Sequence, residues 1–214
     1  PLVARRGTGA TTVAATMLIA ARAGIRVFAT GGIGGVHRSA TPGRPAPIDE
    51  SADLAELART SMVVVCAGAK SILDLPATWE RLETLGITVV GYQTDELPGF
   101  FAAETGIRLA NRVESAEQVA AIFRAERALG RPGALVVVQP PPVEHRLPGS
   151  AVDAAVERAL AGASADGVSG SAVTPSLLAA VERETGGRSL QANLALLEAN
   201  ARLAGEIARA LVGH

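Results

Sequence analysis

Residues 62–67, with the sequence MVVVCA, form an uninterrupted apolar run that is typical of a β-strand covered on both faces. Strands of this kind occur mainly in parallel sheets, where helices lie against both sides. Shorter runs rich in β-branched residues recur at 25–29 (IRVFA), 87–90 (ITVV) and 134–138 (ALVVV). The four runs therefore predict the strands of one mainly parallel sheet.

Helical patterns separate these runs and repeat a β/α rhythm about four times along the chain. This rhythm predicts an α/β fold in which helices flank a mainly parallel sheet on both faces (α/β/α). The expected helices span 11–23, 51–60, 76–85 and 115–129.

The rhythm ends at three consecutive prolines, 140–142. Three segments with helical spacing of apolar residues follow at 150–163, 174–185 and 189–212. We expect them to form a C-terminal helical cap that packs back on the sheet. The stretch TPGRPAP at 41–47 is the expected exposed, flexible loop, because glycine and proline dominate it.

Length and composition favour a single domain over residues 1–214. Hydrophobic residues make up 48%, charged residues 19%, and the net charge is −1, which argues against a disordered chain and a general polyanion binder. Aromatic residues, at 3%, are too few for the stacking platforms of single-stranded nucleic-acid binders. No apolar run approaches the ~18 residues of a membrane span. We therefore expect neither nucleic acid nor a membrane as a partner.

Cys66 is the only cysteine of the chain. An intrachain disulfide framework and a multi-cysteine zinc site are thereby excluded, and a reducing, cytoplasmic setting is expected. Because Cys66 lies within a predicted strand, we interpret it as a small core residue rather than a nucleophile.

Lysine usage points to one residue, because nineteen of the twenty basic side chains are arginine and Lys70 is the single lysine. An amine differs from a guanidinium in that it loses its proton readily and then acts as a nucleophile. Surrounded by small residues after a strand, Lys70 is a candidate for imine formation with a sugar aldehyde. The structural alternative is a lysine beside a helix start, or one that neutralises a phosphate.

Two further segments are expected beside Lys70, because ligands of parallel sheets gather at the carboxyl ends of the strands. The segment TGGIGGVH at 30–37 suits an anion such as phosphate, with a simple turn as the alternative. It lacks the dinucleotide-binding spacing, and CAGAKS at 66–71 lacks the P-loop spacing. The acidic segment DESAD at 49–53 could hold a divalent cation, or could simply cap a helix.

Six blocks of sequence resemble the pseudouridine-5′-phosphate glycosidase (indigoidine synthase A-like) family, in the same order and over nearly the whole chain. They are GTGATTVAATM (7–17), VFATGGIGGVHR (27–38), SADLAELART (51–60), VVVCAGAKSILDLP (63–76), VVGYQTDELPGF (89–100) and TGGRSLQANLALLEANARLAGEIA (185–208). The resemblance implies reversible cleavage of the C–C glycosidic bond of pseudouridine 5′-phosphate to uracil and ribose 5-phosphate. It also implies a Mn²⁺-type divalent ion, a cytoplasmic location and a homotrimer.

The same resemblance assigns roles to residues. Lys70 matches the lysine that forms the imine, and His37 is implied to be an acid/base or sugar-positioning group. Asp49 matches the metal-binding aspartate, with Glu50 as a competitor, because loop 38–48 is longer than the family's usual form. The residues implied to contact substrate are Val13, Thr30, Ser51, Ala52, Asp53 and Asn193.

The resemblance also leads us to expect that the chain lacks the N-terminal third of the family's proteins. That segment carries the glutamate assigned as proton donor and a second lysine. The main alternative function is therefore a catalytically impaired fragment or remnant that binds a sugar phosphate. A Schiff-base aldolase-like enzyme is a further alternative, and a sugar kinase is the weakest because no nucleotide motif is present.

Overall fold

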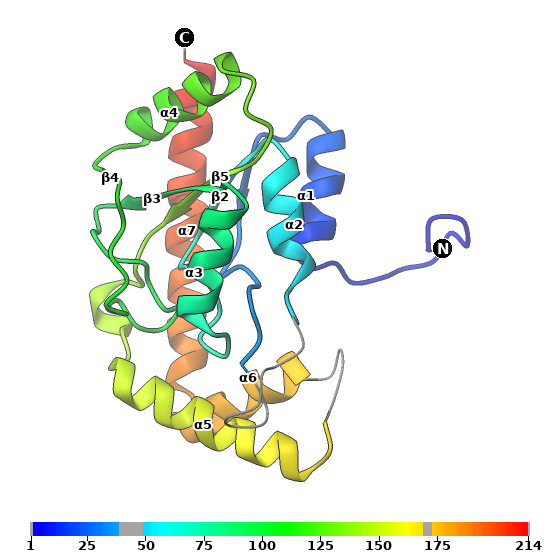
Figure 1. Cartoon of the computed structure of the whole chain (residues 1–214), viewed down its shortest axis with the longest axis vertical. Coiled ribbons are helices and arrows are strands. Elements are labelled where there is room, and N and C mark those ends of the chain that lie inside the picture. The colour runs from blue at the N-terminus through cyan, green and yellow to red at the C-terminus, as the bar shows by residue number, and fades with distance from the viewer. Residues whose placement is uncertain (1, 39–48, 169–172, 214) are drawn as a thin grey trace.

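The computed structural model describes residues 2–38, 49–168 and 173–213. At its centre is a five-stranded sheet in the order β1-β2-β5-β3-β4 (Figure 1). Every pairing between neighbouring strands is parallel. The strands are β1 (Val27–Ala29), β2 (Val63–Cys66), β3 (Thr88–Tyr92), β4 (Arg112–Val113) and β5 (Leu135–Val138).

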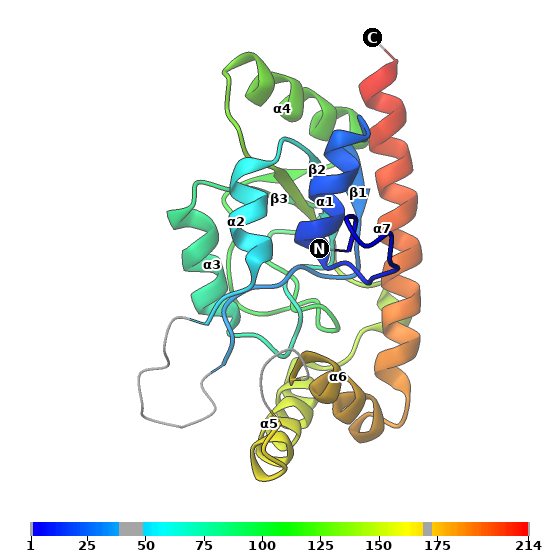
Figure 2. The same ribbon diagram turned by 90° about the vertical axis from the view of Figure 1, so that its right-hand side faces the viewer.

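Seven α-helices surround the sheet in the described residues, and the predicted α/β class is confirmed. Figure 2 shows α7 along one side of β1 and β2, with α1 and α2 on the other. The helices are α1 (Val13–Arg22), α2 (Ala52–Arg59), α3 (Leu75–Thr84), α4 (Ala116–Ala128), α5 (Gly149–Ala165), α6 (Val173–Glu184) and α7 (Arg188–Val212), with a short 3₁₀ helix η1 (Val143–His145).

Two apolar cores lie on opposite faces of the sheet. In β2, Val64 and Cys66 belong to the core under α1, α2 and α3, whereas Val63 and Val65 belong to the core under α4 and α7. This alternation follows from the period of two in a strand, and it explains why the whole MVVVCA run is apolar. The thiol of Cys66 is fully buried, and this burial raises its pKa to about 12. The predicted core role of Cys66 is confirmed.

Each strand and helix expected from the sequence is present, with ends shifted by a few residues. Two elements were not predicted, β4 and η1, because a strand of two residues and a 3₁₀ helix of three leave no periodic pattern. The loop expected at 41–47 lies outside the described residues.

The predicted C-terminal helical cap is present, and its three helices pack in two different ways. Helix α7 packs on the sheet against β1 and β2, as expected. Helices α5 and α6 instead pack against each other beyond one end of the sheet (Figure 1). Their buried residues extend the core on the α1–α3 side, so they close the end of the sheet rather than its face. Among the described helices, none is both long and apolar enough to cross a membrane.

Candidate active site

Past the ends of β1 and β2, the two glycine-containing segments continue side by side. The amide of Ala67 donates to the carbonyl of Gly31 at 2.9 Å, and the amide of Ile33 donates to the carbonyl of Gly68 at 3.0 Å. The amide of Lys70 then donates to the carbonyl of Ile33 at 3.1 Å. The main chain of Lys70 is thereby fixed against the glycine-rich segment.

Close packing explains why these segments need glycine. A Cβ atom on Gly35 would lie 2.3 Å from Oγ1 of Thr78. Gly68 has a positive φ of +82°, and a Cβ atom there would lie 1.9 Å from the carbonyl oxygen of Pro98. At these two positions glycine therefore lets other parts of the protein itself pack close to the backbone.

Several amides of the glycine-rich segment are already used inside the protein. The amide of Val36 donates to Oγ1 of Thr78 at 3.0 Å, and the amide of His37 donates to the carbonyl of Asp49 at 2.9 Å. The amides of Ile33 and Gly34 are also hydrogen-bonded within the chain. An anion bound at this segment would have to use other donors.

Asp53 connects three parts of the site. One oxygen of its buried carboxylate accepts a hydrogen bond from the amide of Ala14, and the other accepts one from the amide of Gly34, both at 2.8 Å. Ser51 caps α2 by accepting a hydrogen bond from the amide of Asp53 at 3.2 Å. The starts of α1 and α2 are thus joined to the glycine-rich segment through one carboxylate.

The residues around Asp53 meet at these two helix starts. Val13 is the first residue of α1 and is buried, whereas Ala52 is the first residue of α2 and is exposed. Because both helix N-termini carry partial positive charge, their meeting point favours a negatively charged group. Val13, Ser51, Ala52 and Asp53, predicted separately from two blocks, come together here.

His37 and Asp49 form a second pair within the site. Nδ1 of His37 lies 3.0 Å from Oδ1 of Asp49, within ion-pair distance but without the alignment of a hydrogen bond. The Asp49 side chain is 68% exposed, so it can reach a ligand from solvent. The adjacent Glu50 is held by Arg81 through two hydrogen bonds of 2.6 and 2.9 Å, which lower the pKa of Glu50.

The carboxylates of Asp49 and Glu50 suit only a cation that keeps most of its water ligands. No group of three or more histidine, cysteine or acidic side chains converges in the part of the chain that the structure describes. Asp49 has an accessible carboxylate, whereas both oxygens of Glu50 are engaged by Arg81. Of the two candidate ligands, the geometry favours Asp49, with water completing most of the coordination shell.

Helix α7 brings two asparagines to the other side of the glycine-rich segment. Oδ1 of Asn193 lies 3.2 Å from the position of a Cβ atom on Gly31. Nδ2 of Asn200 donates to the carbonyl of Thr30 at 2.8 Å, and its Oδ1 accepts from Nε2 of Gln139, also at 2.8 Å. Asn200 and Gln139 were missed by the sequence analysis. The sequence signal for Asn200 was its position seven residues after Asn193, on the same face of the helix.

A cavity of about 310 Å³ is lined by Arg38 and Ser71, the residues that directly follow His37 and Lys70. It opens between the turn after Lys70, the 99–107 loop and the start of α5. None of the predicted site residues lines it. The polar residues that do are Arg38, Ser71, Asp74, Glu104, Thr105 and Asp153.

The family model described as "Indigoidine synthase A like protein" matches residues 1–210. The chain belongs to the indigoidine synthase A-like family. The resemblance inferred from the six sequence blocks is therefore confirmed.

Curated relatives in the family include a pseudouridine-5′-phosphate glycosidase of Gemmatimonas aurantiaca, 64% identical over 95% of this chain and 65% of the relative. Another, from Herpetosiphon aurantiacus, is 56% identical over 98% of this chain and 68% of the relative. The chain thus spans about two thirds of the length of the curated relatives that it matches.

Solved structures share the fold. The prealnumycin C-glycosynthase AlnA, crystallised in complex with ribulose 5-phosphate, is 41% identical, with a TM-score of 0.87 over 97% of this chain and 67% of its own. An indigoidine synthase A-like protein from Thermotoga maritima is 43% identical, with a TM-score of 0.83 over 92% of this chain and 63% of its own.

Proposed function

We propose that this chain carries the lysine-bearing part of a pseudouridine-5′-phosphate glycosidase. Its substrate would be pseudouridine 5′-phosphate, and its products uracil and ribose 5-phosphate, in a reversible reaction of nucleotide catabolism. The names of relatives at 64% and 56% identity support this activity. A sugar phosphate bound to a relative of 41% identity supports the substrate class.

One observation carries the proposal: the single lysine of the chain is hydrogen-bonded through its main chain to the segment that gathers the other candidate residues. In the proposed reaction, the C1–O4′ bond of the ribose ring breaks and O4′ takes up a proton, while the neutral amine of Lys70 forms a bond to C1 and loses a proton. The bond between C1 and the uracil carbon breaks, and its electron pair leaves with uracil, which takes up a proton. The nitrogen lone pair then forms the C=N bond of the imine, and water releases ribose 5-phosphate.

His37 and Asp49 have supporting roles in the proposal. The imidazole of His37 would move a proton near the sugar or hold it in position. Asp49 would hold a divalent ion such as Mn²⁺, which, when bound, would offset negative charge on the substrate. The accessible carboxylate of Asp49 supports this choice over Glu50.

The remaining predicted residues divide into two groups. Thr30 and Asn193 would line the ribose and phosphate pocket, together with Val13, Ser51 and Ala52 at the paired helix starts. Asp53 would act by positioning, since both of its oxygens accept hydrogen bonds from the chain's own amides. A homotrimer in the cytoplasm is part of the proposal, on the family resemblance.

Borohydride trapping with ribose 5-phosphate tests the proposal, because reduction converts an imine into a stable secondary amine. We expect one sugar phosphate on the peptide that carries Lys70. The Lys70→Arg variant should take up none, because a guanidinium stays protonated. Uracil release, measured in parallel, separates a full glycosidase from a chain that only binds and traps the sugar.

The control is Arg22→Lys, which adds a second amine at an exposed position at the end of α1. The peptide carrying position 22 should stay unlabelled under conditions that label Lys70. Equal labelling of both peptides would mean non-specific glycation, and the proposed role of Lys70 would be wrong.

A further inference from the structure

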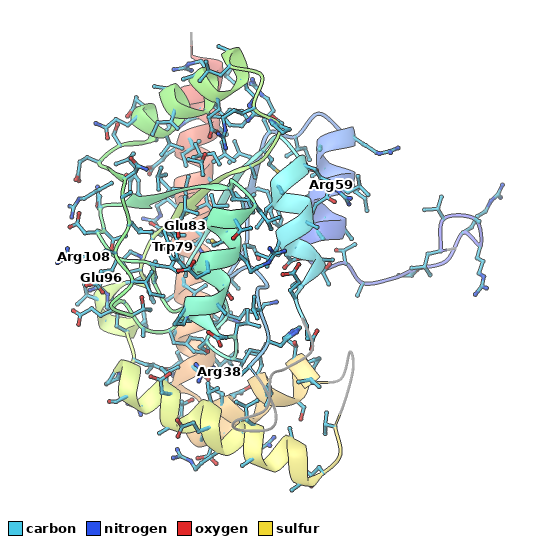
Figure 3. The ribbon with its side chains drawn as sticks, in the orientation of Figure 1. Arg38, Arg59, Trp79, Glu83, Glu96 and Arg108 are labelled. Atoms are coloured by element: carbon cyan, nitrogen blue, oxygen red, sulfur yellow. The ribbon has the colours of Figure 1, made fainter. Side chains whose placement is uncertain are left out.

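Arg38 directly follows His37, and its side chain reaches the turn that follows Lys70. Nε of Arg38 donates to the carbonyl of Leu73 at 2.9 Å, and Nη2 donates to the carbonyl of Ser71 at 3.3 Å. Figure 3 shows Arg38 between the lower end of the sheet and α5. One guanidinium thus holds two carbonyls within three residues of the candidate nucleophile.

The main chain around this contact is paired on both sides. The amide of Leu73 donates to the carbonyl of Lys70 at 3.0 Å, which closes the turn. His37 and Leu73 form an antiparallel bridge, and the amide of Asp74 donates to the carbonyl of Val36 at 2.9 Å. The main chain therefore joins the segment carrying His37 to the turn carrying Lys70, and the Arg38 side chain adds two further hydrogen bonds to that turn.

The same guanidinium also reaches α5. Nη2 of Arg38 lies 3.5 Å from Oδ1 of Asp153, whose side chain is 63% exposed, whereas that of Arg38 is only 26% exposed. An ion pair with such an exposed partner contributes little on its own. The planar fork of arginine, in contrast, donates to both carbonyls from two nitrogens in a fixed geometry, which the ammonium of a lysine lacks.

We propose that Arg38 is a positioning residue for Lys70, and that it acts by fixing the 70–73 turn through the carbonyls of Ser71 and Leu73. The inference rests on the proposed role of Lys70 as nucleophile. A neutral side chain at position 38 would remove the charged donor to both carbonyls and leave the turn held to the glycine-rich segment only by main-chain hydrogen bonds. Because small displacements of a nucleophile cost large factors in rate, imine formation should slow more than sugar-phosphate binding weakens.

The test compares Arg38→Gln with Arg158→Gln. Arg158 is the matched control because it pairs with Glu184 at 2.7 Å elsewhere on α5 and lies outside the site. For each protein we would measure the rate of borohydride-trapped labelling of Lys70 and the Kd for ribose 5-phosphate. We expect Arg38→Gln to lower the labelling rate about tenfold or more while the Kd changes about threefold or less. Arg158→Gln should leave both unchanged.

Two further variants separate the carbonyl contacts from the ion pair. Arg38→Lys should restore part of the labelling rate, because an ammonium still donates to carbonyl oxygens but lacks the fixed fork of a guanidinium. Asp153→Asn should have a much smaller effect than Arg38→Gln, because the carbonyl contacts remain. A loss in Asp153→Asn equal to that in Arg38→Gln would assign the effect to the ion pair and overturn the inference.

Hydrogen exchange gives a readout that does not depend on the chemistry of Lys70. The amides of Lys70 and Leu73 should exchange about tenfold faster in Arg38→Gln than in wild type or Arg158→Gln. Wild-type exchange rates at these amides in Arg38→Gln would overturn the positioning role. Absence of any imine in the wild type, with faster exchange in Arg38→Gln, would instead contradict the proposed function alone.

Discussion

The carboxylate of Asp53, at the start of α2, accepts a hydrogen bond from the amide of Gly34 at 2.8 Å in the buried part of the site. Its other oxygen accepts a hydrogen bond from the amide of Ala14, also at 2.8 Å. Three segments that are distant in sequence therefore share one negatively charged group. Removing that group leaves two amide donors without an acceptor.

We expect Asp53→Asn to destabilise the protein by about 1–3 kcal/mol, because an amide nitrogen would face a backbone N–H in place of a carboxylate oxygen. Denaturant unfolding measures the change. The control is Asp95→Asn, which removes a half-exposed partner of Arg112 and should cost about 1 kcal/mol or less. Equal losses in the two variants would show that the Asp53 link contributes no more than a surface ion pair.

Gly35→Ala should cost about 1–3 kcal/mol, because the added methyl group would overlap the Thr78 hydroxyl. Thermal unfolding checks the effect. Gly205→Ala is the matched control, since a Cβ atom there meets nothing within 4 Å on α7 and should stabilise the helix by up to ~1 kcal/mol. A Gly35→Ala variant as stable as wild type would mean that the neighbouring segments move apart easily.

Asp49→Asn should weaken Mn²⁺ binding, whereas Glu50→Gln should leave it close to wild type. The reason is that both Glu50 oxygens are engaged by Arg81, while the Asp49 carboxylate is accessible. Titration of Mn²⁺ followed by electron paramagnetic resonance measures the affinity, and chelation with EDTA should remove the ion reversibly. Loss of Mn²⁺ binding in Glu50→Gln alone would show that Glu50, and not Asp49, is the metal ligand.

Cys66 should resist thiol reagents in the folded protein near pH 8, because its pKa is raised to about 12 by burial and the reagents attack the thiolate. Rapid modification of native protein would contradict this.

The raised pKa of Cys66 also makes the stability of the folded protein depend on pH. An unfolded thiol ionises near its ordinary pKa of 9.0, so the stability that Cys66 contributes is present below that pH and falls as pH rises toward 12. Cys66→Ala should lack this alkaline decline.

The strands were predictable because continuous apolar runs such as 62–67 and 134–138 have few other interpretations. The order of the strands in the sheet was not predictable, because the pairing of β5 with both β2 and β3 depends on contacts between residues far apart in the chain. Local pattern also located α5 and α6 without showing that they pack on each other at the end of the sheet.

Within the site, the sequence blocks pointed to Lys70, His37 and Asp49, and in the structure Nδ1 of His37 lies 3.0 Å from Oδ1 of Asp49. The sequence did not show that Asp53 is saturated by amides of its own chain, because those donors are backbone groups without a sequence signature. Arg38 was hidden for a similar reason, since its acceptors are the carbonyls of Ser71 and Leu73.

The position of β5 bears on how the protein is made. This strand follows β2 and β3 in the chain but lies between them in the sheet, paired with both along four residues. During synthesis, β2 and β3 therefore cannot pair with β5 until residues 135–138 have left the ribosome. Such long-range pairing is slow and leaves apolar strands uncovered during synthesis. A nascent chain arrested before residue 135 would lack the strand that joins β1 and β2 to β3 and β4, so the two halves of the sheet could not yet be connected.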